Sequence, residues 1–381
     1  MNGSAEAATP AIDTSALPGP AQRMLADSAP APLRMMAAKG VAPGLKSDAI
    51  VTLVCAFAQS SNAELAQTAR QTLENFPEAI LQGALATDLQ PRVLELLAEA
   101  HHAESSVVIR LLAARQITSI ALELVAQKAN EAIGEVVAAS DSVLLRFPRV
   151  IEKLYMNKRV RMSTADRLVD LAVRNNLELN IPAFKQAAAA IQNQLIPEPT
   201  EEPGFDDELF KQVEQLSEQL PIDVEEDTHE VNDEGQEELK RKFLPLYAQL
   251  GNMTVSQKIR RATLGTGAER MLLVRDRNRL VASAAAQSPM LKENEATLIA
   301  GSRSVIDDVL RIIAQNKDFT RLHQVKLNLV CNPRTPFSFS SRLIPLLRDS
   351  DLKMLSKSKN VPGAIQTAVR QQLDRKKKEK D

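Results

Sequence analysis

Residues 91–128, PRVLELLAEAHHAESSVVIRLLAARQITSIALELVAQK, decide the fold class of this chain. Their large apolar residues recur at steps of three and four, the spacing of one face of an α-helix. These residues are Leu94, Leu97, Ile109, Leu112, Ile117, Ile120, Leu122, Leu124 and Val125. Ser105 and Ser106 stand before the run 107–115, where a serine hydroxyl accepts a hydrogen bond from a free N–H of the first helical turn. The stretch predicts short amphipathic helices in close succession.

The helical pattern extends over residues 46–196 and is interrupted at regular places. The residue before a proline is disfavoured in a helix, so each X-Pro step marks an expected boundary. Such steps occur at Phe76-Pro77, Gln90-Pro91, Phe147-Pro148 and Ile181-Pro182. Of the 381 residues, 44% are hydrophobic but only 3% are aromatic, and no tryptophan occurs. Helices accept such an Ala- and Leu-rich composition, whereas β-sandwiches and barrels favour β-branched and aromatic residues. We therefore expect an all-α fold, either a bundle or an α-solenoid.

The ends of the helical region differ from it in composition. Residues 1–45 contain six prolines among Ala, Gly and Ser, which predicts a disordered arm, with a short docking helix at 22–38 as the alternative. Residues 197–238 contain 17 Asp or Glu against one Lys, which predicts an acidic linker with one helix at 206–220. Residues 239–373 form the predicted basic helical-repeat domain, followed by a Lys-rich tail at 374–381.

The near-neutral total charge of −1 hides a strong segregation of charge. Residues 239–381 carry 28 Lys or Arg against 12 Asp or Glu, a net charge of +16 that matches the −16 of the linker in magnitude. A tethered acidic segment is present at a high effective concentration near its basic neighbour. Two interpretations of the linker follow: it is a solvated spacer, or it contacts the basic repeat domain and competes there with an external acidic ligand.

The basic half also repeats itself loosely. Ser288-Pro289 and Asn332-Pro333 lie 44 residues apart, and each follows a helical stretch and precedes another. With Leu346-Leu347-Arg348-Asp349 and Lys359-Asn360-Val361-Pro362, this pattern resembles the HEAT-like and variant leucine-rich repeats of bacteria over residues 255–373. The resemblance implies a stack of helical repeats. Some variant leucine-rich repeat proteins carry a cysteine-ligated cluster, which the isolated Cys55 and Cys331 cannot supply.

No combination of residues predicts a catalytic site, and we expect neither an enzyme nor a cofactor. Cys55 and Cys331 are expected to be buried small hydrophobic residues. His101-His102 is expected to be a solvated pair near a helix end, because no third metal ligand follows it. Gly265-Thr266-Gly267 lacks the Lys-Ser/Thr end of a phosphate-binding loop, and we interpret it as a turn between helices.

The basic surface is the remaining functional signal. Its candidate polyanion-binding residues are Lys258, Arg260, Arg261, Arg270, Arg275, Arg277, Arg279, Lys326, Arg334, Arg348, Lys353, Lys357 and Lys359. Such a surface binds acidic protein segments, or phosphate backbones of nucleic acid as the alternative. Few aromatic side chains are available for base stacking, so a protein partner is the first hypothesis. The N-terminus lacks a secretory pattern and no stretch is apolar enough to span a membrane, so we expect a non-catalytic scaffold in the cytoplasm.

Overall fold

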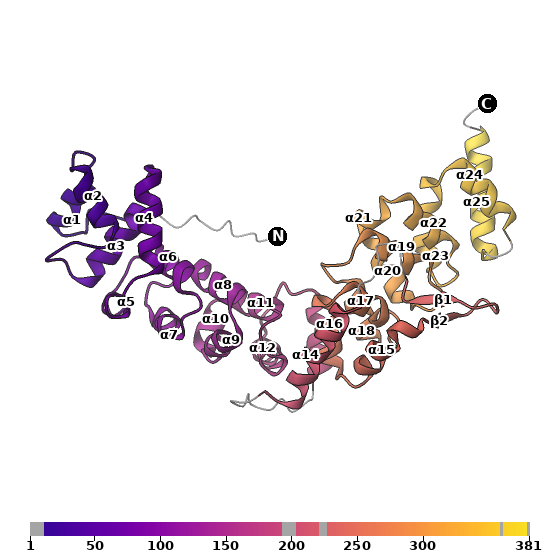
Figure 1. The fold of residues 1–381 in the computed structure, drawn as a ribbon. Helices are drawn as coiled ribbons and strands as arrows, with labels where there is room; N and C mark the ends of the chain where they lie inside the picture. Colours follow the sequence, from indigo (N-terminus) through magenta and orange to yellow (C-terminus); the bar gives the residue numbers. More distant parts are fainter. Residues whose placement is uncertain (1–10, 193–202, 221–226, 359–360, 379–381) are drawn as a thin grey trace. The chain divides into compact units, whose positions relative to one another are not determined.

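The computed structural model describes residues 11–192, 203–220, 227–358 and 361–378, and these residues are mostly helical (Figure 1). The expectation of an all-α fold is confirmed at this level, since the described residues form helices α1 to α25 with only a two-stranded sheet beside them. The chain divides between Asn180 and Ile181 into two compact units.

The first unit consists of helices joined by short turns. They are α1 (Gly19–Leu25), α2 (Ala31–Ala38), α3 (Ser47–Ala58), α4 (Ala63–Glu74), α5 (Glu78–Leu85), α6 (Pro91–His101), α7 (Ser105–Ala113), α8 (Ser119–Lys128), α9 (Glu131–Ala138), α10 (Asp141–Arg146), α11 (Pro148–Met156) and α12 (Met162–Arg174). Proline occupies the first turn of α6 and α11, where its missing N–H would have had no helical partner. The X-Pro steps at these two positions therefore mark helix starts.

Most of these helices pack in two rows. α6 packs against α8 and α8 against α11, while α5 packs against α7, α7 against α9 and α9 against α12. Leu97 of α6 and Leu111 of α7 are fully buried, and burial of such a side chain contributes roughly 1.5–3 kcal/mol. The buried face of α7 contains Val107, Val108 and Leu111, so Ile109, which the spacing had placed with the core, is exposed.

Residues 11–45 differ from the predicted disordered arm. α1 and α2 both form there, and both pack against α3. Ala21 of α1 and Ala37 of α2 have no exposed surface. The prolines responsible for the wrong expectation stand at the beginnings of the two helices, where they favour helix rather than oppose it. Residues 1–10 of the predicted arm lie outside the described residues.

The second unit begins earlier than the sequence predicted. Its helices are α13 (Phe184–Ile191), α14 (Phe205–Glu218), α15 (Leu244–Gly251), α16 (Val255–Leu264), α17 (Gly267–Leu273), α18 (Arg279–Ala286), α19 (Glu293–Gly301), α20 (Asp307–Gln315), α21 (Lys317–Thr320), α22 (His323–Cys331), α23 (Phe337–Leu343), α24 (Asp349–Lys357) and α25 (Gly363–Lys378), with 3-10 turns η1 (Arg241–Phe243) and η2 (Ile344–Leu346). α13, which the sequence analysis assigned to the domain 46–196, packs against α16 and α18 and belongs to this unit.

Two asparagines join stacked helices in the same way in the two units. Asn157, after α11, donates from Nδ2 to two carbonyl oxygens at the end of α8, at 3.0 and 2.8 Å. Asn332, after α22, donates to two carbonyl oxygens at the end of α19, at 2.9 and 2.7 Å. In both cases Oδ1 accepts a hydrogen bond from the backbone N–H two residues later, at 3.0 Å. The side chain thus satisfies carbonyl groups that a helix end leaves without a helical partner.

These hydrogen bonds join residues between 28 and 32 positions apart, which differs from the 44-residue spacing found in the sequence. The 44-residue match aligns α18 with α22. However, α18 packs against α16 and α20, whereas α22 packs mainly against α19. The short helix α21 lies between α20 and α22 and lengthens this part of the chain. The sequence match therefore compared helices that have different neighbours.

The acidic segment is structured wherever it is described. α14 forms close to the helix predicted at 206–220, and Leu209, Phe210 and Val213 are buried. The strands β1 (His229–Val231) and β2 (Glu237–Leu239) form an antiparallel hairpin that the sequence analysis did not predict. Its five-residue turn is closed by Asn232, whose Oδ1 accepts from two backbone N–H groups, and Gly235 supplies a φ of +77°. In Figure 1 the hairpin extends beyond the helices of this unit.

Candidate interaction surface

The first group of predicted polyanion-binding residues, at 258–279, is largely used inside the protein. Arg261 and Glu269 form a bidentate ion pair, with Nε–Oε1 and Nη2–Oε2 distances of 2.6 and 2.8 Å. The Arg261 side chain is 1% exposed and that of Glu269 is 0% exposed. Glu269 also accepts a hydrogen bond from the backbone N–H of Thr266, which caps α17. Gly265-Thr266-Gly267 is therefore a turn between helices, as the sequence predicted.

A second buried ion pair lies beside the first. Arg270 donates from Nε and Nη2 to the two carboxylate oxygens of Glu295, at 2.9 and 2.8 Å, and from Nη1 to the carbonyl of Gly265 at 2.6 Å. A Cβ atom on Gly265 would stand 2.4 Å from the Arg261 carbonyl oxygen. Glycine is therefore required where the backbone approaches these pairs.

Helix α14 of the acidic segment covers this region. The guanidinium groups of Arg260 and Arg261 lie 5.3 and 4.8 Å from the centre of the Phe210 ring, within the range of cation–π attraction. Glu214 lies 3.6 Å from Nη1 of Arg261. The acidic segment thus contacts the basic half of the chain through α14.

Four groups converge on one carboxylate of the hairpin. The hydroxyls of Ser302 and Ser304 donate to Oε2 of Glu237 at 2.7 and 2.6 Å, and the backbone N–H of Arg303 donates to Oε1 at 2.6 Å. Nε of Arg275 lies 3.4 Å from Oε2. We call Arg275 and residues 302–304 the carboxylate cradle. Burial alone would raise the pKa of Glu237, but these hydrogen bonds and the charge of Arg275 lower it to about 2.

The other cations of the first group differ in exposure. Lys258 pairs with Asp276 at 3.3 Å and is largely buried. Arg279 pairs with Asp308 on the surface, and Arg277 is exposed. Among the predicted polyanion-binding residues of this group, the side chains of Arg260, Arg261, Arg270 and Arg275 are therefore buried rather than part of an accessible basic surface. Burial removes these guanidinium groups from water. Carboxylates compensate the charges of Arg261, Arg270 and Arg275, and the ring of Phe210 lies against Arg260.

The second group of predicted residues is different. Arg334, Arg348, Lys353 and Lys357 are exposed, Lys326 is partly exposed, and Lys359 lies outside the described residues. Arg334 also donates to the carbonyl of Val305 at 3.2 Å. The accessible positive charge of the predicted set is thus concentrated on α22 to α24 rather than along the whole second unit.

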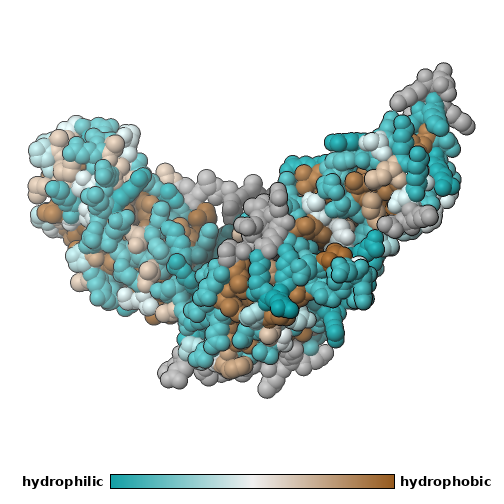
Figure 2. Space-filling view, turned by 45° about the vertical axis from the view of Figure 1, so that its right-hand side comes forward, coloured by the Kyte–Doolittle hydropathy of each residue, from teal (hydrophilic) through white to brown (hydrophobic). Residues whose placement is uncertain are grey.

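The exposed face of α24 combines positive charge with an apolar side chain. Lys353, Met354 and Lys357 follow Ser350 at helical spacing, and all four are exposed. Met354 is 51% exposed, and Leu346, just before the helix, is 60% exposed. We call Arg348, Lys353, Met354 and Lys357 the α24 stripe. Figure 2 shows that hydrophobic residues form separate patches on a mostly hydrophilic surface.

The histidines are placed differently from the expectation of a solvated pair. His101 is buried: Nε2 lies 2.7 Å from the carbonyl oxygen of Leu73, and Nδ1 lies 2.8 Å from Oε1 of Glu104. His323 has a carboxylate partner that the sequence did not reveal, since its Nε2 lies 2.9 Å from Oδ2 of Asp351. Both histidines connect secondary-structure elements. No group of three His, Cys, Asp or Glu side chains in the described part of the chain is arranged to hold a metal ion.

The cysteines have little nucleophilic character. Cys55 is fully buried, and burial raises its pKa far above the ordinary range of a thiol. Partial burial and the charge of Asp351 raise the pKa of Cys331. The thiolate is the reactive form, so neither residue is suited to nucleophilic catalysis.

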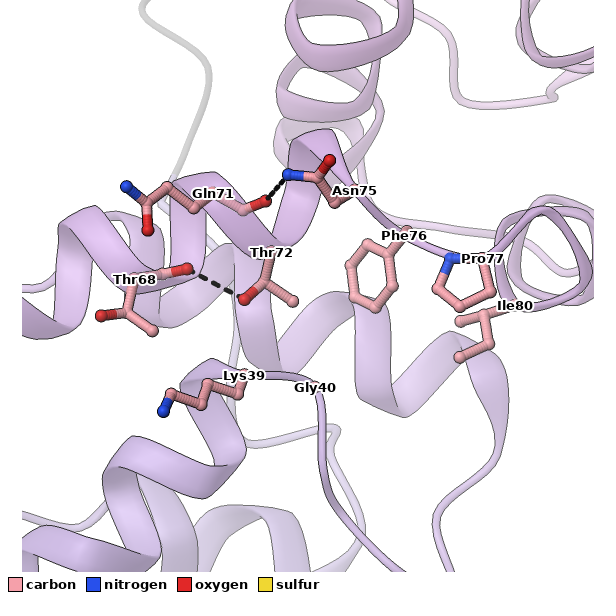
Figure 3. A pocket seen from close by; sticks show the side chains of 9 residues that line it. All are labelled: Lys39, Gly40, Thr68, Gln71, Thr72, Asn75, Phe76, Pro77 and Ile80. Atoms are coloured by element: carbon pink, nitrogen blue, oxygen red, sulfur yellow. Dashed lines mark hydrogen bonds between the residues drawn. The ribbon is translucent and has the colours of Figure 1, made fainter.

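An open pocket of about 450 Å³ lies in the first unit, beside the C-terminal half of α4 (Figure 3). Phe76, Pro77 and Ile80 form its apolar side. The hydroxyl of Thr72 and the amide of Asn75 donate to carbonyl oxygens of their own helix, so these groups do not point to a ligand. A second pocket, of about 350 Å³, lies between α4 and α6.

Comparisons with known proteins add no family assignment: no family model, curated protein or solved structure matches the chain. Among the described residues, no helix combines the length and the apolar character needed to cross a bilayer.

Proposed function

We propose that this protein is a non-catalytic helical-repeat scaffold of α-solenoid, HEAT-like architecture that binds an acidic segment of a protein partner in the cytoplasm. The two rows of helices in the first unit and the asparagines that join stacked helices support the repeat architecture. The observation that carries the binding function is the α24 stripe, where exposed lysines flank an exposed methionine.

The composition of the stripe favours an acidic segment with apolar side chains. Lys353 and Lys357 attract carboxylates, while Met354 offers a flexible apolar contact that adapts to different side chains. Leu346 extends the exposed apolar surface near the beginning of the helix. An amphipathic acidic helix matches both properties, because its charged and apolar residues recur with the same period as those of α24.

The test uses the full chain and a fluorescent peptide of about 20 residues, with Glu on one face and Leu at helical spacing on the other. Anisotropy is measured for the wild type and for the Lys353→Glu/Lys357→Glu variant. Two lost contacts of about 0.7 kcal/mol each weaken binding about tenfold. Lys292→Glu/Lys317→Glu is the matched control, because it changes the total charge equally at exposed positions outside α24.

The two double variants decide the proposal together. We expect the control variant to bind the peptide within about threefold of the wild type, and added salt to weaken binding by both. Equal weakening by the two double variants would show that total charge, rather than the α24 stripe, determines binding. No binding of the peptide to the wild-type chain at low salt would also contradict the proposal.

Binding of nucleic acid is the second candidate function, and one observation favours it. Residues 321–377 contain 12 Lys or Arg against three Asp, and many of these cations are exposed. Phosphate contacts depend on charge and steeply on salt, but not on an apolar side chain. Met354→Ser therefore distinguishes the two candidates: it weakens binding of the peptide if the partner is a protein segment, and leaves binding of duplex DNA unchanged if phosphate contacts dominate.

A further inference from the structure

The hairpin β1–β2 is weakly held apart from its contact with the carboxylate cradle. The residues of its two strands are partly or fully exposed, although Thr228, just before β1, is fully buried. Glu230 lies directly opposite Glu238 in the register, and like charges in facing positions destabilise an antiparallel pair. A two-stranded hairpin is also marginally stable on its own. The attachment of the hairpin therefore depends strongly on Glu237, together with Asp227, which pairs with Arg275 at 2.8 Å.

The cradle itself is fixed by contacts that do not involve the hairpin. Asn332 donates to the carbonyl oxygen of Ser302 at 2.7 Å and thereby holds the loop after α19. Arg275 donates from Nη1 to the carbonyl of Met271 at 2.8 Å and from Nε to the hydroxyl of Ser304 at 3.0 Å. With the hairpin in place, the Arg275 side chain is only 5% exposed. The donors thus stay in place when the carboxylate leaves, as a preorganised site requires.

We propose that the carboxylate cradle is a binding site for an acidic side chain on a loop of a protein partner, and that the hairpin β1–β2 is its tethered competitor. The two serine hydroxyls and the Arg303 N–H supply three hydrogen bonds, and Arg275 supplies the positive charge. This site is built from the α17–α18 loop and the α19–α20 loop, so it is separate from the α24 stripe and does not depend on the function proposed for it.

The hairpin itself supplies the probe for a test. A fluorescent peptide with the sequence of residues 227–240, DTHEVNDEGQEELK, is added to the full chain, either wild type or Glu237→Gln. In the wild type the tethered hairpin, at an effective concentration of about 1 mM, opposes a peptide with a Kd of about 0.1 mM, which weakens binding about tenfold. The Glu237→Gln chain is therefore expected to bind the peptide about tenfold more tightly than the wild type.

Two controls link the binding to the cradle. A peptide in which Gln replaces Glu237 is expected to bind the Glu237→Gln chain much more weakly than the wild-type peptide. Adding Ser304→Ala to that chain removes a hydroxyl donor and is expected to weaken binding of the wild-type peptide. Far-ultraviolet circular dichroism checks that each variant remains helical. Equal binding of the two peptides, or no gain in the Glu237→Gln chain over the wild type, would overturn the proposal.

Discussion

The buried pair of Arg261 and Glu269 allows the sharpest stability prediction. In the Glu269→Gln variant the shape of residue 269 is kept and its oxygen can still accept the hydrogen bond from Thr266, but its charge is lost. The guanidinium of Arg261 then stays buried, with Glu214 at 3.6 Å as its remaining ion-pair partner. Removing one partner of a buried pair costs about 3–5 kcal/mol. We expect a cost in this range, because Arg261 loses its two shortest carboxylate contacts and keeps only the longer one to Glu214.

The effect is measured by native-state hydrogen exchange with mass spectrometry. Peptides that cover α16 and α17 report on the pair, and peptides that cover α8 in the first unit provide the internal reference. A loss of about 3–5 kcal/mol lowers the protection of α16 and α17 between about 100-fold and about 4,000-fold. The protection of α8 is expected to remain the same.

A second variant separates the cost of leaving Arg261 without its carboxylate partner from the cost of changing the packing around the pair. Arg261→Met/Glu269→Gln removes both charges and fills the space of the arginine with an apolar chain, so no uncompensated ion remains. We expect it to cost about 1–3 kcal/mol less than the sum of the two single variants. Unchanged protection in Glu269→Gln would refute the reasoning, and so would additive losses in the double variant.

Three further predictions concern other parts of the chain. Lowering the pH should release the hairpin in two steps. Burial and the charge of Arg275 lower the pKa of His229 from 6.5 to about 4, so its contribution to the attachment of the hairpin is complete above pH 6.5 and decreases between pH 6.5 and about 4. The pKa of Glu237 is lowered from 4.5 to about 2, so its contribution to the attachment is lost between pH 4.5 and about 2. Exchange of the hairpin amides from pH 7 to 2.5, corrected for intrinsic rates, measures this, and His229→Gln should remove only the upper step. His101→Ala should destabilise the first unit by about 1–3 kcal/mol, because it leaves the buried carbonyl of Leu73 without its donor; thermal unfolding measures this, and an equal loss in His102→Ala would contradict it. Gly265→Ala should destabilise the second unit by about 1–3 kcal/mol through its clash with the Arg261 carbonyl, while Gly251→Ala, where a Cβ meets no atom within 4 Å, is the control for urea unfolding.

Local signals explain which parts of the fold were predictable. The three- and four-residue spacing and the proline steps indicate helices because helix formation depends mainly on residues within a few positions of one another. Local signals were misleading at α1 and α2. The proline-rich composition of this segment suggested disorder, whereas both helices are stabilised by packing against the later helix α3, and Ala21 and Ala37 are buried. The 44-residue match aligned two helices, α18 and α22, that have different neighbours, because sequence similarity between helices does not say which helix packs against which.

The sequence by itself determined the helical character of the chain and the separation of acidic from basic segments. Only the tertiary structure decided which charges are paired inside the protein and which face the solvent. Arg261, Arg270 and Arg275 have carboxylate partners 8, 25 and 48 residues away, respectively. No local sequence pattern predicts such ion pairs. Charge is a property of each residue, but its solvation depends on every element that surrounds it. For that reason the basic cluster at 258–279 became largely an internal network, while Lys353 and Lys357 remained accessible on α24.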